Sequence, residues 1–217
     1  MRKVAIITSR QHSSRLPDKA MALINDKPML WHIVQRVEVS DVDETVVATT
    51  ESSDDIVRFC VRNLIPCWIG EEDDQLSRIY DTALKFDTDV IVRIWGDSPF
   101  IDPTLINETI KLFTIAKLDY AHTVNYPRGL RVAVFTFKSL KQAQKHMDYK
   151  ERHIFNEVNE PVWWEKHYKV GALTSKENLS HIKLDVDTQE DLDRARFIYE
   201  KIYTGGIFKY KDIEKWM

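Results

Sequence analysis

The chain has 217 residues, of which 30% are charged and 43% hydrophobic, as expected for a globular protein without extensive disorder. Its formal net charge of −3, from 31 Lys and Arg against 34 Asp and Glu, excludes a bulk attraction to nucleic acid or to an anionic membrane. The length suits one core with a small lobe and is short for two typical domains. We therefore expect one domain over residues 1–217, and any anion site in it must be local.

The sequence also indicates where the protein resides. No apolar stretch approaches the length that crosses a bilayer, and the start, Met1–Thr8, turns polar too soon for a signal peptide. Cys60 and Cys67 lie in no metal-like or CxxC pattern, which is typical of buried thiols. We expect a cytoplasmic location, no membrane contact and no cysteine chemistry.

The first half of the chain alternates between two kinds of segment. Short β-branched runs predict strands at Val4–Ile7, Thr45–Ala48, Cys67–Ile69 and Val90–Ile94. Helical apolar faces lie between them, within residues 29–37, 56–64 and 76–83. Strands separated by single helices favour right-handed βαβ units, so the fold class is α/β with a mostly parallel sheet flanked by helices.

The pattern changes after Asp102-Pro103, a cap and first turn that predict a helix over Leu105–Ile115. Two further strands are expected, followed by a helix and a late strand; these are Tyr120–Val124, Leu130–Phe137, Ser139–Met147 and Lys183–Asp187. Residues of about 120–180 would form a small β-containing lobe. Thr188–Asp191 resembles a capping box and begins a helix that ends before Gly205, and a short helix is expected within residues 207–217.

A basic loop, Ser9–Lys19, directly follows the first predicted strand. It carries three cations and two hydroxyls, namely Arg10, Arg15, Lys19, Ser13 and Ser14. Guanidinium groups pair bidentately with phosphate oxygens, and ligands bind beyond the carboxyl ends of strands in open α/β sheets. The pattern therefore predicts a polyphosphate site, the alternative being a solvated basic loop. The sequence contains neither GxxxxGK nor GxGxxG, which excludes a P-loop or a dinucleotide fingerprint.

Acidic residues lie at the ends of two of the predicted strands. Asp97, in Gly96–Pro99, should project at the same edge as the basic loop, and Asp185 and Asp187 alternate along a strand and so share a face. Carboxylates beside phosphates call for a divalent cation, and Mg²⁺ binds through one or two carboxylates plus substrate phosphates. The alternatives are a plain turn at Asp97 and a helix cap at Asp187.

Several motifs together resemble a known family. They are Ser-Arg-x-x-Ser-Ser-Arg-Leu-Pro-x-Lys at 9–19, Ala-Thr-Thr at 48–50, Gly-Glu-Glu-Asp-Asp at 70–74, Arg-Ile-Tyr at 78–80, Val-Arg-Ile-Trp-Gly-Asp-Ser-Pro at 92–99, Tyr-Pro-Arg-Gly at 126–129, Arg-His at 152–153 and Leu-Asp-Val-Asp-Thr at 184–188. In this order they are similar to the cytidylyltransferases of the SpsF type from spore-coat polysaccharide synthesis. More distantly, the chain resembles the CMP-Kdo and CMP-sialic acid synthetases.

The resemblance implies a nucleotide-diphospho-sugar transferase fold, Rossmann-like and GT-A-like, that uses CTP and Mg²⁺ and releases pyrophosphate. It implies catalytic roles for Arg10, Arg15, Lys19 and Asp97. It also implies nucleotide contacts from Arg10, Ser13, Ser14, Arg15, Lys19, Ala48, Thr49 and Gly96, and metal binding by Asp97, Asp185 and Asp187. The implied reaction is attack of an acceptor hydroxyl or phosphate oxygen on the α-phosphorus of CTP, which needs mostly positioning and charge neutralisation.

The acceptor side departs from the pattern. Relatives often have acids where this chain has Arg131 and Ala133, and such a change favours a more anionic acceptor; the alternative is that Arg131 points to solvent. Arg128, Arg131 and His153 are the candidate acceptor contacts, although a structural role is commoner for a single histidine. Trp95 either stacks on substrate or fills core.

Two other functions fit the same pattern. A glycosyltransferase could use a similar sheet with an Asp-x-Asp metal site, but the three cations of the loop suit a triphosphate better than a diphosphate. A catalytically silent nucleotide-binding homologue is the second. The expected partners are CTP and a small-molecule acceptor, with a homodimer formed through Trp163–Trp164 or the terminal helix if these do not simply pack on the domain.

Overall fold

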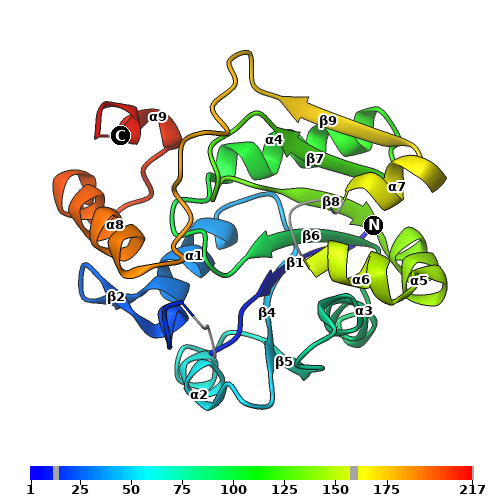
Figure 1. Ribbon diagram of the computed structural model, residues 1–217, viewed down its shortest axis with the longest axis horizontal. Coiled ribbons are helices and arrows are strands. Elements are labelled where there is room, and N and C mark those ends of the chain that lie inside the picture. Colours follow the sequence, from blue (N-terminus) through cyan, green and yellow to red (C-terminus); the bar gives the residue numbers. More distant parts are fainter. Residues whose placement is uncertain (12–14, 157–160, 217) are drawn as a thin grey trace.

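The computed structural model describes residues 1–11, 15–156 and 161–216, without the side chains of residues 149, 153, 154, 156 and 215. A seven-stranded sheet runs through the molecule in the order β5-β4-β1-β6-β8-β7-β9 (Figure 1). The strands are β1 (Lys3–Thr8), β4 (Glu44–Thr50), β5 (Cys67–Gly70), β6 (Val90–Trp95), β7 (Tyr120–Val124), β8 (Ala133–Thr136) and β9 (Val170–Thr174). A separate ribbon pairs β2 (Leu23–Ile24) with β3 (Lys27–Pro28).

The first half of the sheet is parallel throughout. β1 pairs with β4 on one side and β6 on the other, and β4 pairs with β5. Helices α1 (Met29–Glu38), α2 (Asp54–Arg62) and α3 (Gln75–Lys85) connect these strands. Residues 4–7 of β1 are fully buried because helices cover both faces, as the uninterrupted apolar run predicts. The expected strands and helices of this half are confirmed.

The second half contains the one strand of the described seven-stranded sheet that runs against its neighbours. β8 is antiparallel to β6 and to β7, whereas β7 and β9 are parallel. The residues that precede β8 therefore lie at the carboxyl end of β6, beside the residues that follow β6. With four of the six adjacent strand pairs parallel, the described sheet confirms the predicted α/β fold class.

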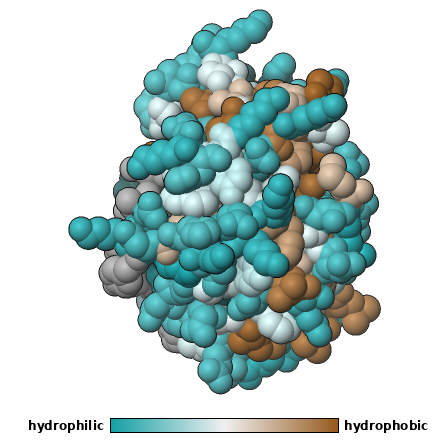
Figure 2. Space-filling view, turned by 90° about the vertical axis from the view of Figure 1, so that its right-hand side faces the viewer, coloured by the Kyte–Doolittle hydropathy of each residue, from teal (hydrophilic) through white to brown (hydrophobic). Residues whose placement is uncertain are grey.

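Helices pack on both faces of the sheet. One core contains α1, α2, α4 (Pro103–Ile115) and α8 (Gln189–Ile202), and the other contains α3, α5 (Phe137–His146), α6 (Tyr149–Asn156) and α7 (Pro161–His167). Trp164 of α7 is fully buried and stacks with Tyr120 and Phe135, so this tryptophan pair packs on the sheet. The surface over α5–α7 is mainly hydrophilic, with apolar atoms in small groups (Figure 2).

Helix caps follow the sequence signals. The Asp102 carboxylate accepts a hydrogen bond from the Thr104 amide at the start of α4, and Thr188 and Asp191 form the predicted capping box of α8. The C-terminal segment forms α9 (Tyr210–Ile213) and a 3₁₀ turn, Glu214–Trp216. Within the described residues, no helix combines the length and apolar character that crossing a membrane requires.

Two predicted strands need correction. Lys183–Asp187 is not a strand, because its backbone bonds go to two different segments: the Leu184 amide donates to the Arg128 carbonyl and the Val186 amide to the Asp97 carbonyl. Only one isolated bridge, Arg128 with Lys183, has strand geometry. β8 begins at Ala133 rather than Leu130, since the residues before it turn away at Gly129, which has a φ of +88°.

Candidate functional site

The site lies where β1 and β6 end, side by side. The Gly96 amide, just after β6, donates to the Thr8 carbonyl at 2.9 Å. A Cβ atom on Gly96 would lie 2.6 Å from that carbonyl oxygen and 2.7 Å from the Ser9 Cβ, so only glycine fits. This close approach places Asp97 against the loop that follows β1.

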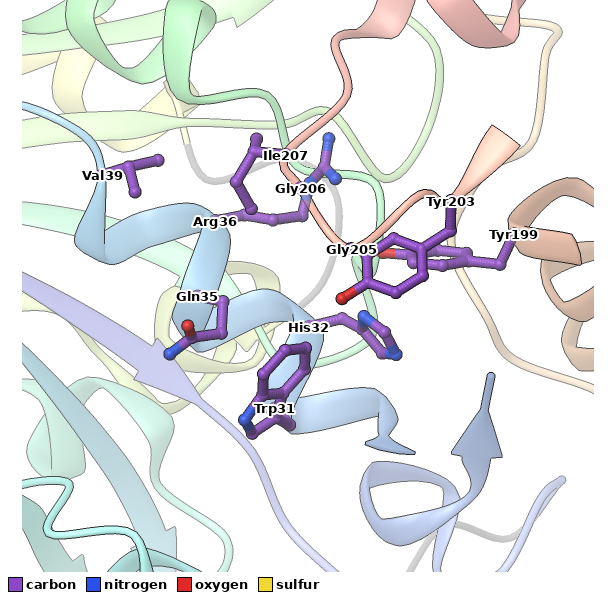
Figure 3. A pocket seen from close by; sticks show the side chains of 10 residues that line it. All are labelled: Trp31, His32, Gln35, Arg36, Val39, Tyr199, Tyr203, Gly205, Gly206 and Ile207. Carbon is purple, nitrogen blue, oxygen red and sulfur yellow. The ribbon is translucent and has the colours of Figure 1, made fainter. Parts of the chain in front are cut away.

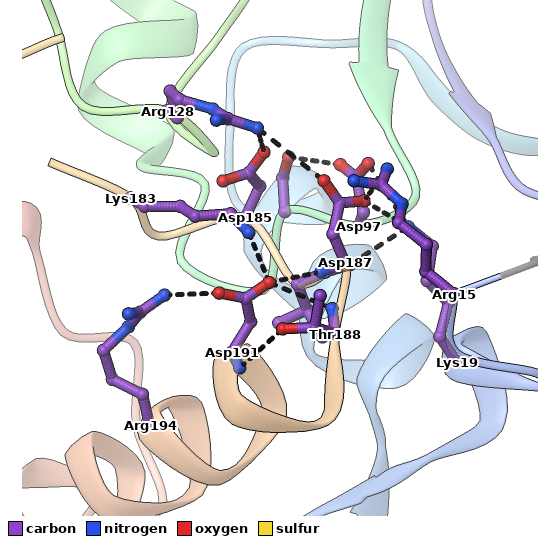
Figure 4. A network of polar contacts seen from close by, with 12 residues as sticks. Arg15, Lys19, Asp97, Arg128, Lys183, Asp185, Asp187, Thr188, Asp191 and Arg194 are labelled. Carbon is purple, nitrogen blue, oxygen red and sulfur yellow. Dashed lines mark hydrogen bonds and ion pairs between the residues drawn. The ribbon is translucent and has the colours of Figure 1, made fainter. Parts of the chain in front are cut away.

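Lys19 is the centre of a charged group at this edge (Figure 4). Its Nζ lies 3.0 Å from Asp187 Oδ1 and 3.6 Å from Asp97 Oδ2, and it donates to the Val186 carbonyl at 3.0 Å. The Lys19 side chain is 16% exposed and that of Asp187 8%, so water screens this pair little. The structure thus brings together residues that are 168 positions apart.

Two arginines complete the group. Arg15 Nη2 lies 3.1 Å from Asp187 Oδ1, and Arg128 Nη2 lies 2.8 Å from Asp185 Oδ2 and 3.7 Å from Asp187 Oδ2. We call these six side chains the aspartate cluster: Arg15, Lys19, Asp97, Arg128, Asp185 and Asp187. Its three carboxylates face three cations, and both arginines are substantially exposed. The arginines can therefore turn to a ligand more easily than Lys19 can.

The carboxylates of the cluster differ in their environment. Burial raises the pKa of Asp185, the Arg128 charge opposes this, and the neighbouring Asp97 and Asp187 raise it further. For Asp187 burial also acts upward, but the charge and hydrogen bond of Lys19, followed by Arg15, bring the pKa below the ordinary aspartate value. Asp185 Oδ1 is buried and has no hydrogen-bond partner in the described part of the chain. An added cation would satisfy that oxygen.

The donor set fits a magnesium ion that also binds substrate. Among the described residues, no group of three or more His, Cys, Asp or Glu side chains is arranged to hold a metal unaided. Three aspartates that converge on one edge, each already ion-paired with a cation, instead match the way Mg²⁺ takes one or two carboxylates and fills its other positions with phosphate oxygens and water.

The start of α8 fixes the backbone of Asp187. Asp191 Oδ2 accepts hydrogen bonds from the Asp187 amide at 3.0 Å and from the Thr188 amide at 2.9 Å, and Asp191 also pairs with Lys183 and Arg194. Figure 4 shows these contacts directly beneath Asp187. The capping-box pattern located Asp191 as a cap, and sequence reasoning missed that the same carboxylate supports the aspartate cluster.

The other nucleotide candidates lie toward β4 and β5. Arg10 is exposed and contacts the aspartate cluster in no described interaction; instead its charge helps to lower the pKa of Glu72, after the hydrogen bonds from Ser52 and Thr50 and against the effect of burial. Ala48 and Thr49 are buried beside it, and the Ala48 carbonyl accepts from the Ser9 amide at 3.1 Å. Ser13 and Ser14 lie outside the described residues.

Glu72 and Arg78 are charged side chains of this region that the sequence motifs contained without a role. Arg78 is buried and donates to the Glu71 and Glu72 carbonyls, and burial lowers its pKa to about 10. Gly70 packs on it, since a Cβ there would lie 3.1 Å from Arg78 Cγ. The Gly-Glu-Glu-Asp-Asp motif therefore forms a loop that is held by Arg78.

A second group of side chains lies beside Asp97 at the end of β6. The guanidinium carbons of Arg93 and Arg131 lie 4.5 Å and 5.3 Å from the centre of the Trp95 ring. His122 of β7 pairs with Ala133 of β8, and burial followed by the Arg131 charge lowers its pKa to about 4. We call Arg93, Trp95, His122 and Arg131 the tryptophan cluster. The side chain of His153 lies outside the described residues.

A cavity of about 110 Å³ lies away from this edge, between α1, the end of α8 and residues 205–207 (Figure 3). Trp31, His32, Tyr199 and Tyr203 are among the residues that line it. The polar groups beneath it are bonded to backbone, His32 to the Ile24 carbonyl and Arg36 to those of Ile101 and Phe208. Its side chains therefore support packing, and none of the candidate site residues that the structure describes lines it.

An α/β sheet with cations after its first strand and carboxylates converging from β6 and α8 defines a nucleotidyltransferase-like protein. The chain belongs to the cytidylyltransferase family, whose pattern matches residues 4–212. It is 29% identical to the spore coat polysaccharide biosynthesis protein SpsF of Bacillus subtilis, over 90% of this chain and 85% of that one. These matches confirm the resemblance that the motifs indicated.

Two further comparisons agree. The chain is 34% identical to the 3-deoxy-manno-octulosonate cytidylyltransferase of Trichlorobacter lovleyi, over 52% of this chain and 45% of that protein. A solved cytidylyltransferase structure from Leptospira borgpetersenii superposes with a TM-score of 0.89 at 25% identity, covering 99% of this chain and 93% of that one. The fold is thus that of a cytidylyltransferase along nearly its whole length.

Proposed function

We propose that this chain is a CTP-dependent enzyme that transfers CMP to a sugar or other small-molecule acceptor and releases pyrophosphate. The observation that carries the proposal is the convergence of Lys19, Asp97 and Asp187 at the carboxyl edge of the sheet. An acceptor oxygen forms a bond to the α-phosphorus, the bond from that phosphorus to the bridging oxygen breaks, and pyrophosphate leaves. A hydroxyl acceptor also loses its proton, whereas a phosphate acceptor is already ionised.

In this proposal, different residues of the site bind the triphosphate, the cytidine and the acceptor. Lys19, with Arg15 and Arg10, binds the triphosphate and offsets charge that builds on the leaving pyrophosphate. Ser13, Ser14 and Gly96 contact the nucleotide, Ala48 and Thr49 lie against the cytidine, and Arg128 and His153 contact the acceptor. The exposed Arg15 and Arg128 exchange an aspartate partner for a phosphate oxygen when substrate binds.

A magnesium ion, held by Asp97, Asp187 and Asp185, supplies charge neutralisation at the phosphates. The unpartnered oxygen of Asp185 supports this assignment. Meanwhile Lys19 keeps Asp187 ionised, and Asp191 fixes the backbone of Asp187. The chain's own part is thus to hold three carboxylates in one place despite their repulsion.

The test is pyrophosphate release from CTP, ATP, GTP and UTP, with and without Mg²⁺, over a panel of sugars, sugar acids and sugar phosphates. We expect pyrophosphate release from CTP but not from ATP, GTP or UTP. This release should be lost when the metal is chelated. Asp97→Asn should lower turnover by at least about 10³-fold while the unfolding transition stays unchanged. Asp41→Asn is the matched control, because Asp41 pairs with Lys3 at the opposite edge of the sheet.

The outcomes separate the alternatives. Free nucleoside diphosphate in place of pyrophosphate would indicate a glycosyltransferase. CTP binding without product from any acceptor would indicate a silent homologue. Full activity of the Asp97→Asn protein would remove the aspartate cluster from the reaction and refute the proposed mechanism.

A further inference from the structure

The tryptophan cluster lies on the acceptor side of the proposed reaction. β8 runs antiparallel to β6 with Arg93 opposite Ala133, and Arg131, two residues before Ala133, places its guanidinium carbon 5.3 Å from the centre of the Trp95 ring. Trp95 is itself two residues before Asp97. Arg131 therefore lies at the carboxyl edge of β6, next to the aspartate cluster, although it comes from a different part of the chain.

Arg131 differs from the cations of the aspartate cluster. Lys19, Arg15 and Arg128 each pair with an aspartate, whereas Arg131 pairs with no carboxylate of the described residues. Its described contact is the face of Trp95, which holds the planar guanidinium without neutralising it. The Arg131 side chain is half-buried, so a ligand can reach the charge.

The neighbours of Arg131 leave its charge uncompensated. Arg93 stacks on the same indole and is fully buried, and a second arginine cannot neutralise Arg131. His122 carries no charge near neutral pH, because burial and Arg131 lower its pKa to about 4. Ala133 adds no polar group. Arg131 itself therefore favours an anion, in contrast to the three cations of the aspartate cluster, each of which faces an aspartate.

We propose that Arg131 determines specificity, selecting an acceptor whose carboxylate or phosphate lies against the Trp95 platform. This inference rests on the proposed function, since it names the acceptor class of the same site. A neutral sugar would leave the guanidinium without an anion in a partly desolvated position. A carboxylate or phosphate instead receives two parallel hydrogen bonds from it.

The experiment follows the indole signal of Trp95 by nitrogen-15 NMR, assigned with Trp95→Phe, in protein bound to a non-hydrolysable CTP analogue. The probes are glucose, glucuronate and glucose 6-phosphate, which differ in charge and anion type. We expect shifts with one or both anions and none with glucose. Arg131→Gln should weaken anion binding by about tenfold or more, and Arg131→Lys by less. Lys138→Gln, which removes an exposed charge from α5, is the control.

Three results would overturn this inference: equal binding of glucose, failure of both anions to bind, or anion binding that is unchanged by Arg131→Gln. A merely structural arginine would alter binding of the CTP analogue as well, which we expect to stay within about twofold. If the analogue itself fails to bind the wild-type protein, the proposed function fails instead, so the two results are distinguishable.

Discussion

The aspartate cluster and the tryptophan cluster share one edge of the sheet but hold their charges in different ways. In the first, Lys19, Arg15 and Arg128 each face an aspartate at 3.1 Å or less. In the second, two guanidinium groups stack on one indole, and an adjacent histidine is neutral. A cation that is paired with an aspartate can exchange that partner for a phosphate. Arg131, which stacks on the indole and pairs with no described carboxylate, can bind an anion directly. The comparison predicts that substitutions in the two clusters will affect different substrates.

Removing Lys19 should have the largest effect. Lys19→Met deletes the cation between Asp97 and Asp187, and we expect turnover with CTP to fall by about 10³-fold. The Asp187 pKa should rise as well, because Lys19 is the main influence that lowers it. Steady-state pyrophosphate release measures the first effect.

Lys3→Met is the control for this experiment. Lys3 is also a partly exposed lysine paired with an aspartate, Asp41 at 2.8 Å, but at the opposite edge of the sheet. A comparable loss of turnover in both variants would show that the effect is one of folding. Near-normal turnover after Lys19→Met would contradict the role of the aspartate cluster.

The sequence predicted most strands of the sheet that carries the aspartate cluster, but not the backbone contacts that hold its aspartates in place. β1, β4 and β6 were located because their β-branched runs are buried between helices, and β7 and the partly exposed β5 were located as well. The segment Lys183–Asp187 alternates apolar and charged residues like a strand yet forms no ladder, since its amides bond to Arg128 and Asp97, which no periodicity reveals. β9 was missed because it is a partly exposed edge strand with Gly171 in it.

The placement of side chains within loops was also beyond the sequence. Arg10 and Arg15 belong to one basic loop, but Arg15 faces Asp187 whereas Arg10 acts on Glu72 and Arg78. Similarly, Arg131 reaches Trp95 because the start of β8 lies antiparallel beside the end of β6, which the sequence pattern does not show. Local pattern identifies residue types suited to phosphate, while tertiary pairing decides which of them meet.

Asp191 should give the next largest effect, on stability. Asp191→Asn removes a buried charge that pairs with Lys183 and Arg194, and we expect the free energy of unfolding at pH 7 to fall by about 3 kcal/mol. The folded-state pKa of Asp191 is below its ordinary value, through the Lys183 contact and backbone amides acting against burial. This stabilisation is therefore present above the unfolded pKa near 4 and is lost as the pH falls below it.

Urea unfolding at pH 7 and at successively lower pH checks this prediction. The wild-type protein should lose stability through the acid range, and the Asn variant should show a flatter dependence. Asp193→Asn is the control, because Asp193 is an exposed acid on the same helix paired with Arg196. An unchanged acid dependence in the Asp191 variant would show that the capping box does not support this region.

In the tryptophan cluster, His122 should make the stability depend on pH over a higher range than Asp191 does. Since the pKa of His122 is about 4 in the folded protein and near 6.5 when unfolded, the unfolded chain binds the proton first as the pH falls. Stability is therefore lost between about pH 6.5 and pH 4. His122→Gln should reduce that loss by about 2 kcal/mol, measured by urea unfolding at the two ends of the window. An equal slope in both proteins would mean that His122 titrates normally.

The smallest effect is expected at Trp95, where a cation–π contact and not an ion pair holds Arg131. Trp95→Phe retains an aromatic face of weaker quadrupole, so the KM of an anionic acceptor should rise about threefold while the KM of CTP stays constant. Trp31→Phe is the matched control, since Lys27 lies 5.6 Å from that ring and Trp31 lines the cavity away from the site. A rise in the KM of CTP equal to that of the acceptor would show that Trp95 positions Asp97, and the two clusters would then act as one unit. A change confined to the acceptor would mean that each cluster binds its own substrate, although only Gly96 separates Trp95 from Asp97.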